Sequence, residues 1–351
     1  MWLLVLALAA SAWGGWISAS VPGEAVSICS TDTHLYVVGY AYDVQTWRLV
    51  TRIEVRDKAS GQLVKTYTEP GDLINSCVAI GGRLYLGRLF QISVYDPEPR
   101  RVDEIEPSEG ANPPRGPGHP LLQITRLATD GSHIYVIGVV VEHGQGPLQS
   151  FIHKRSLNLT LLGERYFNLT LSGVGVNPVT GHVWAVGSAA EGNRSVWIVL
   201  ILDQNLNTVR EARPGEEGWP YGVVFDDEGN AYVYGPGGVV KMSKDGDVVS
   251  RAEGHYQRVL YSGGRLYLTR CNQLAVYDKN LKPLYTLETP LDTVNSLAVE
   301  EGRIYVAGQK AGKYTTAALE SGGAPEPTLL LTALAAASIA TALILKRLRK
   351  H

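Results

Sequence analysis

The sequence contains few of the residues from which reactive sites are usually built. Its 351 residues include three cysteines and eight histidines, without the close His/Cys spacing of a metal site. It lacks a G-x-S-x-G nucleophile motif, a glycine-rich phosphate loop, Asp boxes and calcium repeats of the D-x-[DN]-x-[DN]-G type. We therefore predict no metal and no cofactor. An enzyme is less favoured but stays open, because loop residues far apart in sequence can form a site.

The chain also lacks an excess of basic residues. It has 32 Lys and Arg residues against 34 Asp and Glu residues, and four of the basic residues lie in the tail after residue 345. Proteins that bind nucleic acid normally carry a clustered basic surface. We therefore predict no nucleic-acid partner.

The three cysteines, Cys29, Cys77 and Cys271, permit at most one internal disulfide. Cys29 and Cys77 fall on comparable strands of neighbouring repeats, which are described below, and are the pair we expect. The alternative is that both are buried, inert thiols.

Both ends of the chain carry apolar segments. Residues 2–10 are apolar and are followed by small residues, as in a secretory signal peptide, and we expect cleavage after residue 12 or as late as residue 20. An uncleaved anchor is the alternative. Residues 328–345 contain no charge and precede the basic tail at 346–351. At a rise of about 1.5 Å per residue this stretch can span a bilayer as a helix. The sequence thus predicts a cell-membrane protein with one span, an extracellular domain and a cytoplasmic C-terminus.

The linker between the domain and this span, residues 320–327, contains Pro325-Glu326-Pro327. Together with the apolar helix and the basic tail, this motif resembles the PEP-CTERM sorting signal of bacterial surface proteins, which implies that the tail is cut. A plain membrane anchor is the alternative that we favour. Three sequons, at Asn158, Asn168 and Asn193, fit a secreted glycoprotein.

A short phrase returns along the chain in seven forms. It reads THLYVVG, GRLYLG, SHIYVIG, GHVWAVG, GNAYVYG, GRLYLT and GRIYVAG. Each form follows a short apolar run, and each of the first six precedes a strand, a turn and another strand. Its aromatic residues are Tyr36, Tyr85, Tyr135, Trp184, Tyr232, Tyr267 and Tyr305.

Short strands that repeat in this way indicate a β-propeller, because a single blade cannot bury both of its faces. We predict an all-β fold, a seven-bladed β-propeller with four-stranded antiparallel blades over residues 13–319, plus one C-terminal transmembrane helix. The pattern resembles the superfamily of seven-bladed propellers with PQQ-like, NHL-like or YVTN-like repeats. The recurring aromatics are expected to pack between blades. Since the last repeat lacks a strand, we expect residues 16–21 to supply it.

We name the strands of a blade A to D from the axis outward. The D–A and B–C connections then share one face, and the predicted long loops, at residues 107–122, 142–149, 190–194 and 213–219, all belong to it. Loops on a rigid scaffold often carry function. The candidate binding residues on this outward face are His119, His143, Arg194, Trp219 and Tyr221. Variable, solvated loops without a ligand are the alternative.

The first functional hypothesis is a membrane-anchored module that binds a protein or glycan partner at the cell surface. The alternatives are a propeller enzyme that acts on sugars, namely a hydrolase, lyase or quinone-dependent dehydrogenase, or a structural subunit of a cell envelope. Low methionine and cysteine with abundant tyrosine, valine and leucine indicate a thermophilic archaeal source.

Overall fold

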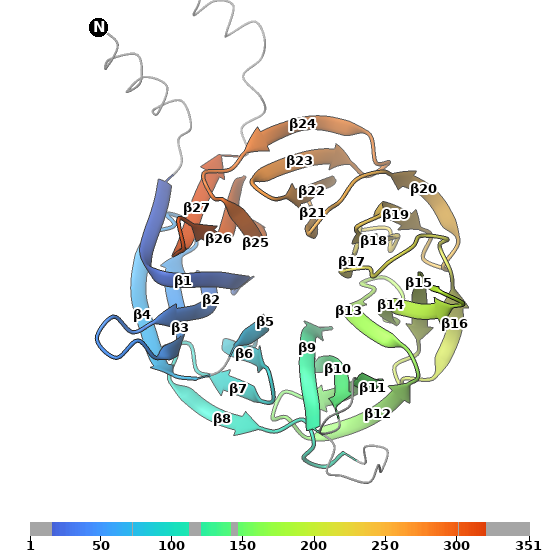
Figure 1. Ribbon diagram of the computed structural model, residues 1–351, viewed down its shortest axis with the longest axis horizontal. Coiled ribbons are helices and arrows are strands. Elements are labelled where there is room, and N and C mark those ends of the chain that lie inside the picture. Colours follow the sequence, from blue (N-terminus) through green and yellow to red (C-terminus); the bar gives the residue numbers. More distant parts are fainter. Residues whose placement is uncertain (1–15, 72, 112–120, 142–146, 301, 321–351) are drawn as a thin grey trace, which may run out of the picture. The chain divides into compact units, whose positions relative to one another are not determined.

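The computed structural model describes residues 16–71, 73–111, 121–141, 147–300 and 302–320. In this part of the chain, all regular elements are antiparallel β-strands, and Figure 1 shows their sheets arranged as a ring around a common axis. The domain is therefore an all-β propeller with four-stranded antiparallel blades. The predicted signal peptide at residues 1–12, the predicted linker after residue 320 and the predicted span at residues 328–345 fall outside the described ranges.

Within those ranges, no helix is long and apolar enough to cross a membrane.

The strands repeat in the order innermost, second, third and outermost. The innermost strands are β1 (Trp16–Ser30), β5 (Ile74–Ile80), β9 (Leu121–Thr129), β13 (Thr170–Val176), β17 (Gly222–Phe225), β21 (Arg258–Ser262) and β25 (Thr293–Glu300). The second strands are β2 (His34–Tyr42), β6 (Arg83–Arg88), β10 (His133–Val141), β14 (Val183–Glu191), β18 (Ala231–Gly235), β22 (Arg265–Arg270) and β26 (Arg303–Lys310).

The third strands are β3 (Leu49–Asp57), β7 (Ile92–Tyr95), β11 (Pro147–Ser156), β15 (Arg194–Leu202), β19 (Gly238–Met242), β23 (Gln273–Asp278) and β27 (Lys313–Glu320). The outermost strands are β4 (Leu63–Pro70), β8 (Arg101–Ile105), β12 (Leu161–Phe167), β16 (Thr208–Ala212), β20 (Val248–Ala252) and β24 (Pro283–Glu288). Five sheets contain one strand of each kind.

The remaining sheet has seven strands, in the order β25-β26-β27-β1-β2-β3-β4. The strand β1 joins its two parts. Its first part pairs with β27, from Trp16 opposite Ala318 to Pro22 opposite Lys313. Its second part, from Gly23 to Ser30, pairs with β2. Residues 16–21 therefore lie beside β27, where the sequence predicted a borrowed strand.

The recurring aromatics lie in the second strands, where they are buried between adjacent blades. Tyr36 and Ile53, for example, share a core cluster with Leu84 and Tyr95 of the next blade. The second strands are covered on both sides, so they read as nearly continuous apolar runs, whereas the outermost strand β4 is largely exposed. The repeated phrase is thus a packing pattern.

Hydroxyl groups of these aromatics also join neighbouring blades. Each of four tyrosines donates a hydrogen bond to a backbone carbonyl in the turn between the third and fourth strands of the next blade. The pairs are Tyr36 to Pro97 (3.3 Å), Tyr85 to Leu157 (2.7 Å), Tyr232 to Lys279 (2.7 Å) and Tyr305 to Lys58 (2.7 Å). The last pair links the end of the ring to its beginning.

The glycine that ends most forms of the repeated phrase is explained by a close approach between two strands. The register slips by one residue in several innermost strands, as in a β-bulge, and there the strand approaches the neighbouring second strand closely. A Cβ atom on the glycine opposite would collide with a backbone carbonyl oxygen. These glycines are Gly39, Gly138, Gly187 and Gly308. The phrase GRLYLT carries threonine instead, and its partner strand β21 pairs with β22 in an unbroken register.

Polar side chains at the bulges connect successive innermost strands. Asn75 donates through Nδ2 to the carbonyl of Ile124 (2.6 Å), and the adjacent Ser76 accepts from the backbone N–H of Leu127 (3.0 Å). Asn295 and Ser296 repeat both bonds at the joint between β25 and β1, with Ala25 and Ile28 as partners. The Asn-Ser dipeptide is therefore a connector between blades.

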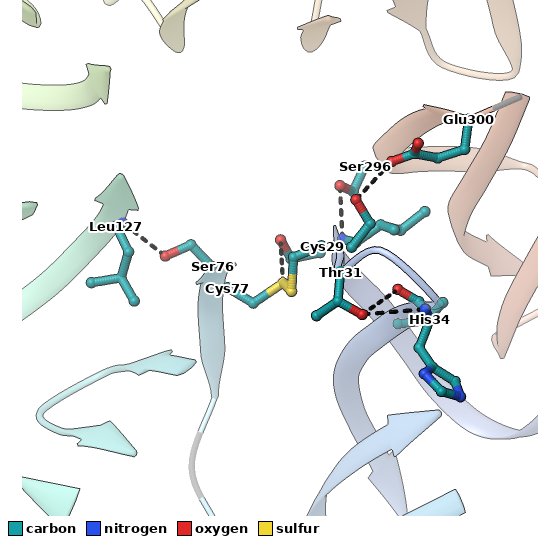
Figure 2. Close-up of a disulfide and its surroundings, with 12 residues drawn as sticks. Cys29, Thr31, His34, Ser76, Cys77, Leu127, Ser296 and Glu300 are labelled. Atoms are coloured by element: carbon teal, nitrogen blue, oxygen red, sulfur yellow. Dashed lines mark hydrogen bonds between the residues drawn. A yellow bond between two sulfur atoms is a disulfide. The ribbon is translucent and has the colours of Figure 1, made fainter. Parts of the chain in front are cut away.

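Cys29 and Cys77 form a disulfide between β1 and β5, with their Cα atoms 6.0 Å apart. Figure 2 shows it beside the Ser76–Leu127 hydrogen bond. Cys271 is a free, exposed thiol. The disulfide adds a covalent link to a joint that otherwise depends on side-chain packing and hydrogen bonds.

Replacing Gly138 with alanine should destabilise the propeller by about 1–3 kcal/mol, because the new Cβ would collide with the carbonyl oxygen of Gln123. Urea unfolding measures the change. Gly163→Ala is the matched control: its Cβ would meet only Leu206, at 3.7 Å, so a change within about 0.5 kcal/mol is expected. Equal unfolding midpoints for the two variants would contradict this account of the repeated glycine.

Reducing the Cys29–Cys77 disulfide should lower the free energy of unfolding by about 2–4 kcal/mol, since it closes a loop with a sequence separation of 48. Thermal unfolding with and without dithiothreitol measures this. Cys271→Ser should respond to the reductant as the natural chain does, whereas Cys29→Ser/Cys77→Ser should not respond. A natural chain that ignores the reductant would rule out the disulfide.

Candidate functional site

The up-and-down course of the strands places their connections on two opposite faces. We call the face with the D–A and B–C connections the loop face, and the face with the A–B and C–D connections the turn face. Of the five predicted binding residues, Arg194, Trp219 and Tyr221 are described and belong to the loop face. His119 and His143 lie outside the described residues.

One predicted loop is shorter than the sequence indicated. We expected a loop over residues 190–194, but β14 continues to Glu191 and β15 begins at Arg194. The antiparallel pairing of β14 with β15 continues up to Glu191 and Arg194, on both sides of Gly192 and Asn193. Arg194 therefore starts a strand, and its guanidinium pairs with the Glu217 carboxylate at 2.6 Å.

The connection that carries Trp219 and Tyr221, residues 213–221, is fixed by backbone hydrogen bonds. Glu216 O accepts from the N–H of Trp197 (2.8 Å), and Gly218 N–H donates to Ser195 O (2.8 Å). Tyr221 N–H donates to Tyr234 O (2.7 Å). The connection thus adds a short edge to β15. The side chains of this connection therefore project from a backbone that hydrogen bonds hold in place.

Trp219 is 61% exposed and forms one wall of a cavity of about 260 Å³. The rest of the lining is mostly amide and hydroxyl groups, contributed by two successive blades, β9–β12 and β13–β16. The lining residues with polar side chains are Gln149, Ser150, Asn168, Thr170, Ser188 and Ser195. Gln149 Nε2 donates to Asn168 Oδ1 at 2.6 Å, which orients both amides. An exposed indole therefore adjoins uncharged hydrogen-bonding groups.

Tyr221 lines a different cavity, of about 190 Å³, with Gln257, Arg258, Val294 and Asn295. Its hydroxyl lies 3.3 Å from Nε2 of His255. Burial, together with the nearby charge of Arg126, lowers the pKa of Arg258 to about 10, so this side chain stays cationic at neutral pH. The structure therefore separates Trp219 and Tyr221, which the sequence placed in one group.

Ion pairs surround the Trp219 connection. Arg251 Nε binds a Glu216 carboxylate oxygen at 3.0 Å, and the Arg213 guanidinium binds both Glu211 and Glu191. All of these side chains are partly or largely exposed, so the pairs are worth little in stability. Because the positive and negative charges are paired, they make this part of the loop face polar with little net charge.

The sequons divide between the two faces. Asn158 lies in the C–D turn between β11 and β12, on the turn face, whereas Asn168 and Asn193 lie on the loop face. All three side chains are exposed. Across the described ranges, no group of three or more His, Cys, Asp or Glu side chains could hold a metal ion.

Three residues of interest were missed by sequence reasoning. Trp47 is 72% exposed in the B–C connection of residues 43–48, and a tryptophan inside so short a connection could have been noticed. Arg126 and Arg258 lie in innermost strands. Nothing in the sequence showed that their strands face each other across the ring.

Comparisons with known proteins identify the fold but no family. A scan of protein-family models finds no match, and a search of curated proteins finds none either. Solved structures match widely, with 706 chains. One is a chain of the "Crystal Structure of Mitotic Checkpoint Complex", with a TM-score of 0.65 and 11% sequence identity, covering 87% of this chain and 94% of that one. This likeness supports the β-propeller fold alone, and so broad a fold hosts many functions.

Proposed function

We propose that the protein is a binding module that presents its loop face to a glycan or protein partner at the cell surface. One observation carries the proposal: the largely exposed Trp219 ring stands on a connection that backbone hydrogen bonds hold in place. Exposed tryptophans on rigid supports are frequent centres of binding energy, because little entropy is lost when they are covered.

The lining of the Trp219 cavity favours a glycan. A sugar ring offers C–H groups that pack on an indole face, and hydroxyls that pair with amides and alcohols. Gln149, Asn168 and Ser195 supply such groups beside Trp219. The solved mitotic checkpoint complex includes a propeller inside a protein assembly, and this supports a protein as the second candidate partner.

The proposed scaffold is a seven-bladed propeller, of which the seven-stranded sheet forms two blades. The sharing of β1 supports this division, since its two parts pair with different neighbours. The innermost strands also contact each other in sequence order from β1 to β25, and β25 contacts β1. The relation to PQQ-like, NHL-like or YVTN-like repeats belongs to the same proposal.

The proposed location is the outer side of a cell membrane, with residues 1–12 as the signal peptide and residues 328–345 as the anchor. The end of β27 supports an outward loop face. The carbonyl oxygen of Gly312, just before β27, accepts a hydrogen bond from Gly23 N–H near the loop face, so β27 ends on the turn face. The exposed sequons and the Cys29–Cys77 disulfide suit an oxidising compartment.

Trp219→Ala should weaken binding to the partner at least tenfold, because the indole covers the ligand and contributes more than about 1.4 kcal/mol. The assay is a glycan array with the purified propeller, followed by titration of the strongest hit. Trp47→Ala is the matched control: it removes an equally exposed indole from the same face on another part of the ring.

A photo-crosslinker at position 219 on native cells extends the test to protein partners, with a probe at Arg265 on the turn face as control. Adducts at position 219 alone support the proposal. Adducts at position 265 alone would reverse the orientation. If no glycan binds and neither probe forms adducts, the binding function is wrong.

Deleting residues 328–351 should move the protein from the membrane fraction to the soluble fraction of cells, because these residues hold the only predicted span. Fractionation with and without alkaline carbonate distinguishes an integral anchor from a peripheral contact. If the truncated chain still resists carbonate extraction, the anchor lies elsewhere.

A further inference from the structure

Equivalent positions of the innermost strands form a ring around the axis. In each strand, this position lies two residues before the partner of the recurring aromatic. The residues are Ser27, Ser76, Arg126, Gly173, Gly222, Arg258 and Ser296. Five are small, and the two others are arginines. At this position the innermost strands therefore carry serine or glycine, except for the two strands that carry a long cationic side chain.

The two arginines belong to innermost strands on different sides of the ring. Arg126 lies in β9, whose innermost neighbours are β5 and β13, and Arg258 lies in β21, whose neighbours are β17 and β25. Figure 1 shows β9 and β21 on opposite sides of the central axis. After burial, the charge of Arg126 is the next cause that lowers the pKa of Arg258, so the two guanidinium groups repel each other.

Arg258 is held in place at the wall of the Tyr221 cavity. Its Nε donates to Asn295 O at 2.5 Å, and its Nη1 donates to Gln257 O at 2.9 Å. Its Nη2 makes no hydrogen bond to any described residue. Two donors thus fix the guanidinium plane, while the third nitrogen is available to a ligand in the cavity of about 190 Å³.

Within the described ranges, no carboxylate forms an ion pair with either arginine. Glu24 shares the partner Asn295 with Arg258, and both of its oxygens are occupied: Oε1 accepts from Asn295 Nδ2 (2.6 Å) and Oε2 accepts from the Tyr40 hydroxyl (2.5 Å). Two cations without a counter-charge in a partly buried place are costly. An anion would relieve both their repulsion and their desolvation.

We propose that the Tyr221 cavity binds an oxyanion, the carboxylate or phosphate group of a small ligand, with Arg258 as the direct donor and Arg126 as the second cation. The planar guanidinium of Arg258 suits such a group because it can offer a charge-assisted hydrogen bond in a fixed direction. Tyr221 and the free amide nitrogen of Gln257, whose Oε1 accepts from Cys271 N–H, would contact the rest of the ligand. This site goes beyond the proposed function, since Trp219 has no part in it.

The test is calorimetric titration of the full propeller with inorganic phosphate, with glucuronate and with glucose, in a low-salt buffer without competing anions. Tighter binding of phosphate or glucuronate than of glucose is the expected result, and the preferred anion distinguishes the two sources of the oxyanion. Affinity should fall with added salt. The highest anion concentration is about 10 mM, which would detect a dissociation constant in the millimolar range. If neither anion binds at that concentration, the proposal is overturned.

Variants locate the site. Arg258→Gln should weaken anion binding at least tenfold, and Arg126→Gln should weaken it several-fold through the lost charge. Arg258→Lys keeps a charge and covers the case in which the glutamine variant fails to fold. Arg265→Gln, on the turn face, and Trp219→Ala should bind the anion as the natural chain does. Unchanged affinity in both Arg126→Gln and Arg258→Gln would place the anion elsewhere and contradict the proposal.

Discussion

The pairing of β1 with β27 is the interaction on which the rest of the propeller depends. A ring of sheets leaves unpaired backbone groups wherever it is not closed, and such an edge is an open site for association. Here one strand from the start of the chain completes a sheet begun at its end and then bends at Pro22 and Gly23 into the next sheet. The Tyr305–Lys58 and Asn295–Ala25 hydrogen bonds reinforce the same joint. The positions of every loop and cavity follow from this closure.

Much of the fold could be predicted from the sequence, because its signals are local. The aromatic in each second strand, the turn residues and the missing last strand all follow from short-range patterns. The bulges could not be predicted, since a register slip is set by two strands together. The glycine of the phrase therefore had no explanation until the carbonyl opposite Gly138 was located.

The candidate site was predicted only in part. Trp219 was identified because it lies in one of the long connections that share the loop face. The ion pair of Arg194 with Glu217 could not be predicted, because it depends on a connection from elsewhere in the chain. Arg126 and Arg258 are separated by more than a third of the chain, and their strands are not neighbours in the ring. The effect of one charge on the other could therefore not be predicted from local sequence patterns.

The architecture provides two kinds of binding surface with different rules. The rim of the loop face is formed by connections whose length and composition can change without disturbing a blade. The axial positions belong to the innermost strands, where a side chain must fit beside its neighbours. Ser76 and Ser296 are used for connections between blades, and a larger residue there would remove those bonds. Arg126 and Arg258 are the two large residues at these otherwise small positions.

The shared strand β1 also has a consequence for the order in which the chain is made. Its second part can pair with β2 as soon as β2 has been synthesised, but its first part must wait for β27, the last strand. At usual rates of translation this delay is on the order of tens of seconds. During that time residues 16–22 are an unsatisfied strand beside a growing set of sheets. While they stay unpaired, the edge of β27 in a neighbouring chain competes with the chain's own β27 for the same strand.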